Sequence, residues 1–147
     1  MAIVGVELNA TPVGCRVYEY DFALDGGAAT AGTDMRGAVG EFAGRSGGVI
    51  PAGAVVLASI TKVVTDMTGN SANTDFSVTT PSLATNTALD AVDPATLDAG
   101  EVFLEMAASG AVTELAADDK PTFIIATDTV TAGKVQHFVY YVVPTAR

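Results

Sequence analysis

The sequence predicts an all-β protein, an antiparallel β-sandwich or jelly roll of about eight strands with at most one short helix. Short segments that alternate apolar and polar residues recur along the chain, and turn-forming residues separate them. Ala, Val, Thr and Gly supply 77 of the 147 residues. Small and β-branched residues at this density suit tight sheet packing and flat subunit contacts better than a deep reactive cleft.

The length of 147 residues suits one domain. Residues 1–15 carry a single charge, Glu7, and show no helical period. We therefore predict an extended N-terminal arm at 1–15 and a single β-sandwich domain at 16–147.

The first strand is expected to begin at Arg16. Beyond it Tyr18, Tyr20 and Phe22 share one face, whereas Glu19 and Asp21 fall on the other. This alternation is typical of a half-buried strand with one polar face. A turn is expected at 25–27, followed by a short strand around Val39 and Phe42 between long loops.

One phrase occurs twice: a turn ending in Ala-Gly that leads into a strand rich in Val or aromatics. The first copy turns at 51–53 and its β block covers 49–65; the second turns at 131–133 and its strand covers 134–143. Glycine supplies the positive φ that such turns need. The sequence thus predicts two long strands, each starting after its Ala-Gly turn.

The sequence patterns for the remaining elements are less distinct. Phe76 and Val78 indicate one arm of a hairpin, and 81–100 holds a turn of helix or a structured loop that Pro94 would stop. A strand at 101–107 is expected to place Val102, Leu104 and Met106 on one face and Phe103 on its outer face. The segment 122–129 is the penultimate strand.

Charge and composition exclude several classes of function. The net charge is −10 with only seven basic residues, which argues against direct nucleic-acid binding. The start of the chain has no basic region or long apolar core of a signal peptide, and no apolar run is long enough for a membrane span. Cytoplasmic synthesis and no membrane contact are the expectations.

Candidate chemical groups have stronger structural interpretations. Ser59 and Lys62 fit a Ser-x-x-Lys pattern, but on a strand they point to opposite faces. His137, the single histidine, is expected to be packed or at an interface; at a subunit contact it could make assembly pH-sensitive. Cys15, the single cysteine, is expected to be a small packed residue.

Carboxylates cluster in two places, each of which is either a solvated acidic loop or a site for a divalent cation. The two groups are Asp90, Asp93, Asp98 and Glu101, and Asp118 with Asp119. Their spacing does not match a known calcium loop, so solvated loops are favoured. The sequence accordingly predicts no catalytic, cofactor-binding or metal-binding residues and no cofactor, and the protein is expected not to be an enzyme.

The repeated phrase also carries a resemblance. The runs 48–57 and 131–142, with a polar hairpin near Asn70, resemble small structural proteins of tailed bacteriophages over about residues 45–80 and 120–144. That resemblance implies a virion component with a β-sandwich fold, among them head decoration or cement proteins and fibre-associated proteins, often trimeric.

The resemblance implies a non-enzymatic head decoration or cement protein that binds and stabilises a capsid through surface complementarity. Its implied partners are the major capsid protein or other virion proteins and further copies of itself, with a homotrimer as the simplest ring. Its implied location is the virion, and the host cytoplasm during assembly. The alternatives are a tail, fibre or neck protein and a carbohydrate-binding sandwich module. The N-terminal arm could add a strand to a neighbour's sheet.

Overall fold

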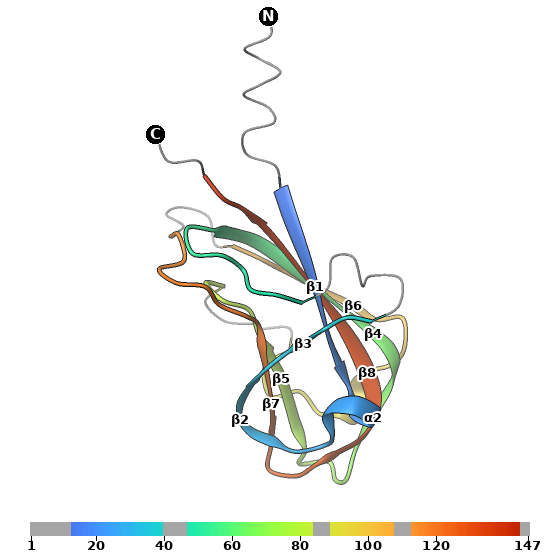
Figure 1. Ribbon diagram of the computed structural model, residues 1–147. Helices are drawn as coiled ribbons and strands as arrows, with labels where there is room; N and C mark the ends of the chain where they lie inside the picture. The colour runs from blue at the N-terminus through green and yellow to red at the C-terminus, as the bar shows by residue number, and fades with distance from the viewer. Residues whose placement is uncertain (1–12, 40–46, 84–88, 108–112, 145–147) are drawn as a thin grey trace, which may run out of the picture.

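The computed structural model describes residues 13–39, 47–83, 89–107 and 113–144 of the chain. Within them the chain is almost entirely extended (Figure 1). In chain order the elements are β1 (Val13–Asp21), α2 (Phe22–Asp25), β2 (Ala29–Asp34), β3 (Arg36–Gly37), β4 (Val55–Gly69), β5 (Asp75–Thr79), η2 (Pro94–Thr96), β6 (Val102–Met106), β7 (Thr122–Ala126) and β8 (Val130–Val142). The all-β prediction is confirmed.

The described strands form two antiparallel sheets. Five strands lie in the order β3-β1-β8-β4-β6, and three lie in the order β2-β7-β5. The long strands β1, β8 and β4 run through the larger sheet, and the smaller sheet lies beside it (Figure 1). This division into five and three strands is a β-sandwich, as the sequence predicts.

The core lies between the two sheets. Tyr20 on β1 contacts Phe76 and Phe123 of the smaller sheet, with ring centroids 5.3 and 4.8 Å apart. Such tilted aromatic pairs stabilise beyond their area alone. The Tyr20 hydroxyl donates to the Gly26 carbonyl oxygen at 2.6 Å, so the buried ring keeps its polar end satisfied.

The two Ala-Gly phrases have different structures. Gly53 lies in the predicted turn before β4, with φ +83. Ala132 and Gly133, however, lie inside β8, and the turn between β7 and β8 is at 127–129. The predicted turn at 131–133 is therefore wrong. Gly133 has φ +126, in a stretch where the pairing of β4 with β8 shifts register, as at a bulge.

Gly133→Ala should lower the free energy of unfolding by about 2 kcal/mol, because strain and overlap add. A Cβ on Gly133 would lie 2.7 Å from the backbone Cα of Met67 and 2.5 Å from its Cγ. Gly53→Ala is the matched control: its φ is also positive, at +83, but no atom lies within 4 Å of the added Cβ, so only about 1 kcal/mol is expected. Urea denaturation followed by circular dichroism compares the two. Equal losses would contradict the close approach at Met67.

Several strand boundaries differ from the sequence-based expectation. β1 begins at Val13, three residues before Arg16, and the rest of the arm lies outside the described residues. The short strand expected around Val39 and Phe42 is misplaced. Strands β2 and β3 precede it, Val39 is exposed outside any strand, and Phe42 is not among the described residues.

Pro94 begins a helical turn instead of stopping one. It occupies the start of η2, where its missing N–H costs nothing. The described stretch around it, 89–100, is a structured loop that contains η2, one of the two expected outcomes. It adds Leu89 and Leu97 to the core, and its Val92 pairs with Phe76 through two backbone hydrogen bonds.

The face of β6 is the reverse of the predicted one. Phe103 is paired with Thr61, which is 2% exposed on the inner face, so Phe103 also points inward and packs against the core. Val102, Leu104 and Met106 consequently face outward. The predicted alternation is present, but only the pairing register determines which face is buried.

Candidate functional site

His137 lies in the core, sealed between two threonines. It is 0% exposed on β8. The Thr61 hydroxyl lies 2.7 Å from its Nδ1, and the Thr80 hydroxyl lies 2.7 Å from its Nε2. Both ring nitrogens are therefore satisfied, since a threonine hydroxyl can donate or accept.

Burial lowers the pKa of His137 to about 3. The ring is neutral at physiological pH and has no access to a substrate. The sequence-based expectation of a packed histidine is confirmed. Because the ring is buried inside one chain, it does not lie at a subunit contact. We therefore expect pH to act on the stability of the fold and not on assembly.

Ser59 and Lys62 do not form a catalytic pair. Ser59 is 1% exposed on the inner face of β4, whereas Lys62 is exposed on the opposite face. Cys15 is a partly buried thiol on β1. These positions agree with the structural interpretations made from the sequence.

The acidic residues support their own loops. Asp93 Oδ1 accepts from the Ala95 amide at 3.0 Å and caps η2, and Glu101 Oε2 accepts from the Asp98 amide at 2.8 Å. Asp118 Oδ1 accepts from the Ala52 amide at 2.8 Å. Within the described residues, no three His, Cys, Asp or Glu side chains are grouped so that they could hold a metal ion.

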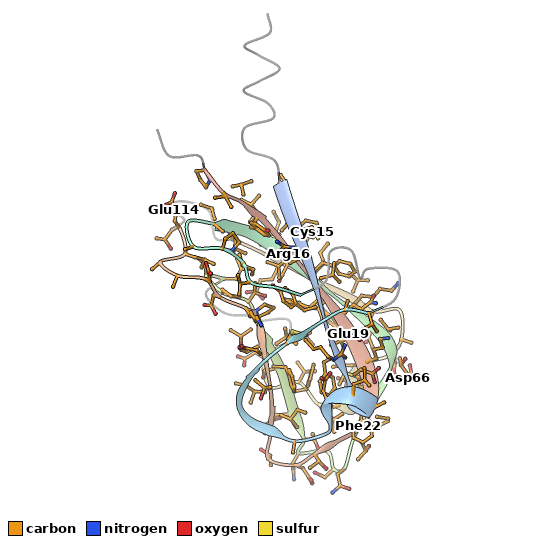
Figure 2. The ribbon with its side chains drawn as sticks, in the orientation of Figure 1. Cys15, Arg16, Glu19, Phe22, Asp66 and Glu114 are labelled. Atoms are coloured by element: carbon orange, nitrogen blue, oxygen red, sulfur yellow. The ribbon has the colours of Figure 1, made fainter. Side chains whose placement is uncertain are left out.

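A charged cluster at the β1–β3 edge was not foreseen. Glu19 was expected on a polar outer face, and it does oppose Tyr18 and Tyr20, but its side chain is 0% exposed. Arg36 Nη1 lies 3.0 Å from Glu19 Oε1, and Lys134 Nζ lies 3.1 Å from Glu19 Oε2. Figure 2 locates Glu19 on β1.

The cluster extends to Asp25 of α2. Arg36 donates from Nε to Asp25 Oδ1 and from Nη2 to Asp25 Oδ2, each at 3.1 Å. Asp25 Oδ2 also accepts from the Asp21 amide at 2.8 Å. Arg36 is the direct partner of Glu19 across β1 and β3, so strand pairing places the charges. Because Glu19 and its partners are far apart in the sequence, no local motif indicates this cluster.

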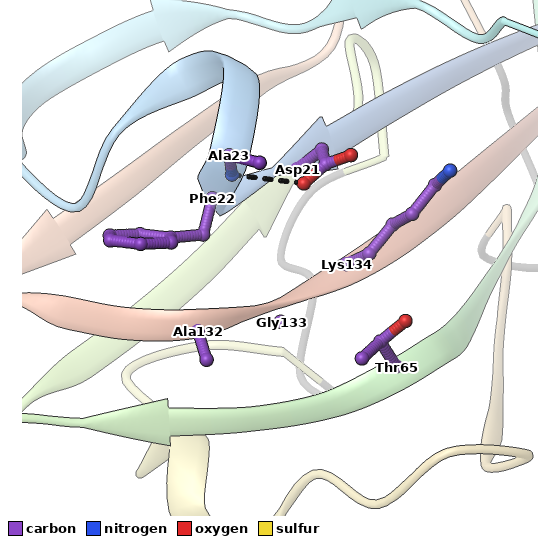
Figure 3. A pocket seen from close by; sticks show the side chains of 7 residues that line it. All are labelled: Asp21, Phe22, Ala23, Thr65, Ala132, Gly133 and Lys134. Atoms are coloured by element: carbon purple, nitrogen blue, oxygen red, sulfur yellow. Dashed lines mark hydrogen bonds between the residues drawn. The ribbon is translucent and has the colours of Figure 1, made fainter.

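A shallow pocket of about 180 Å³ lies beside this cluster. Phe22 and Ala23 of α2 form one side, and Thr65 of β4 with Gly133 and Lys134 of β8 form the other (Figure 3). The Lys134 ammonium is engaged by Glu19. The Asp21 carboxylate, which also lines the pocket, accepts from the Ala23 amide at 3.0 Å.

No helix of the described chain is long and apolar enough to cross a membrane. Among the described residues, β6 places three strongly exposed apolar side chains on one face: Val102, Leu104 and Met106, at 58, 58 and 68%.

The fold occurs in a bacteriophage capsid structure. No family model matches the chain, and no curated protein matches it. The chain is similar to one in the acid-stable capsid structure of Helicobacter pylori bacteriophage KHP30, with a TM-score of 0.52, 13% identity, and coverage of 92% of this chain and 90% of that one. The two share a fold along nearly their whole lengths.

Two further solved structures are more distantly similar. A chain of the cyanophage Pam1 capsid asymmetric unit has a TM-score of 0.49 and 16% identity, with coverage of 91% of this chain and 85% of that one. A chain of the capsid of Ralstonia phage GP4 has a TM-score of 0.44 and 19% identity, with coverage of 92 and 86%.

Proposed function

We propose that the protein is a non-enzymatic structural component of a phage virion, and specifically a head decoration or cement protein. The observation that carries the proposal is the shared fold with a chain of the KHP30 capsid, which covers 92% of this chain and 90% of that one. The sequence resemblance to small phage structural proteins supports the same role.

The chemistry of the chain fits such a role. The single histidine is fully buried in the core. The ion pairs of Glu19, Asp25, Arg36 and Lys134 connect β1 with β3 and β8, and β3 with α2. A net charge of −10 keeps free copies dispersed before assembly. Binding by surface complementarity requires a stable fold and an external contact surface, and it needs no reactive group.

We propose that the major capsid protein is the partner and that copies surround a three-fold axis of the shell. Equivalent sites around a symmetry axis favour closed rings. The proteins would meet in the host cytoplasm during assembly and remain together in the virion.

Particles assembled with and without the chain test this function. Purified chain added to particles that lack it should co-sediment with them, saturate at a fixed number of copies per shell, and raise the temperature at which DNA is released. Shells already saturated with unlabelled chain are the control and should bind no more. Cryo-electron microscopy then locates the copies.

Density on the tail, neck or fibres would replace the head role with the alternative virion position. Absence of the chain from the virion, or glycan binding by the free chain, would refute the proposal.

A further inference from the structure

The outer edge of β6 is unpaired within the described residues. β6 is the last strand of the five-stranded sheet, and within the described chain no strand pairs with its far side. Natural edge strands are usually blunted by charges, proline or a bulge, because an unpaired strand recruits other strands. β6 (Val102–Met106) has regular pairing to β4 and contains no proline or lysine. Its one charged residue, Glu105, pairs with the buried Ser59 and so points to the inner face, which leaves the outer face without a charge.

The backbone amides and carbonyls of β6 point alternately toward β4 and away from it. Glu101 accepts a hydrogen bond from Val63, and Ala107 donates one to Leu57, so the odd-numbered residues are hydrogen-bonded toward β4. The even-numbered residues Val102, Leu104 and Met106 therefore direct their amides and carbonyls away from β4. The same three residues carry the exposed apolar side chains.

We propose that this edge binds the same edge of a second copy, in antiparallel register centred on Leu104. In this register Leu104 opposes its own counterpart, and Val102 opposes Met106 of the other copy. All three pairs join residues whose backbones face the partner, so about six backbone hydrogen bonds form. A two-fold contact needs this self-complementarity.

The charges of β6 agree with that register. Glu105 opposes Phe103 of the second copy and Glu101 opposes Ala107, so no carboxylate meets another directly. The outward face offers apolar pairs only. Like charges directly opposite would destabilise the contact, and a one-residue slip would set Glu105 against Leu104 and break the match of backbone directions.

The contact goes beyond the proposed attachment to a capsid. A three-fold ring cannot use a two-fold contact within itself, so the three β6 edges of one ring would pair with the three β6 edges of a second ring. Loss of the β6 contact is therefore expected to halve the native mass. This holds whether the contact joins two single chains or two rings.

A cysteine at position 104 tests the register. In a Cys15→Ser background, oxidised Leu104→Cys should form a disulfide-linked dimer on a denaturing gel, because the two Cα atoms would lie about 5.5 Å apart, within disulfide range. Val102→Cys is the matched control: its counterparts would be about 13 Å apart along the strand and should not cross-link. Equal cross-linking of the two variants would overturn the proposal.

Leu104→Lys tests the contact without cross-linking. Light scattering over a dilution series should give half the native mass of the wild type, with an unchanged circular dichroism spectrum. Lys62→Gln, a change at an exposed site on the neighbouring strand, should keep the wild-type mass. A native mass unaffected by Leu104→Lys would overturn the proposal.

Capsid binding is a separate measurement. A wild type that is monomeric at every concentration, with capsid attachment lost in Leu104→Lys, would show that the edge binds another virion protein, and this would also overturn self-pairing. Failure of the wild type to bind capsids would refute the proposed function and leave the two-fold contact standing.

Discussion

Glu19→Gln is expected to lower the free energy of unfolding by about 3 kcal/mol. The wild-type carboxylate is fully buried and holds both Arg36 and Lys134. The amide has nearly the same shape, so the packing survives while two partly buried cations lose their counter-charge. Breaking a buried ion pair from one side costs more than the pair contributes, because the remaining charge stays poorly solvated.

Urea denaturation at pH 7, followed by circular dichroism, measures this loss. Glu114→Gln removes an identical charge from an exposed site and should change stability by less than about 0.5 kcal/mol. A double variant, Glu19→Gln with Lys134→Met, should recover part of the loss because one unpaired cation is gone. If Glu19→Gln were as mild as Glu114→Gln, the cluster would contribute nothing to stability.

The fold class could be predicted because it depends on local patterns. Alternation around Tyr18 and Tyr20, and the turn at Gly53, each reflect chemistry within a few residues. The face of β6 could not be predicted, since Phe103 and Leu104 are both apolar and only the pairing with Thr61 decides which one points inward.

The polar clusters were unpredictable for a related reason. Thr61, Thr80 and His137 are separated by up to 76 residues in sequence, and Glu19 meets Lys134 only because β1 lies beside β8. An unpaired strand edge such as that of β6 is likewise a property of the whole sheet. Local sequence therefore determines which strands form, whereas the long-range register determines what they bury and what they expose.

Acid should destabilise the fold through His137. Its pKa is about 3 in the folded chain because burial disfavours the charged ring, against about 6.5 when unfolded. Between these values the unfolded chain binds a proton that the folded chain does not, so stability is fully present above pH 6.5 and falls as the pH approaches 3. From pH 7 to pH 4.5 this contributes a loss of about 2.5 kcal/mol.

His137→Gln separates this loss from that of the carboxylates. The amide can still meet the Thr61 and Thr80 hydroxyls but does not titrate. The variant should be less stable than the wild type at pH 7, because its packing is poorer. It should lose less stability on acidification, because it has no histidine to protonate. The two curves of unfolding free energy against pH should therefore converge below pH 6.5. Thr80→Val is the control: it removes one hydrogen bond from the ring and should lower stability while keeping the histidine's pH window. Parallel curves for wild type and His137→Gln from pH 7 to 4.5 would contradict a sealed, neutral histidine.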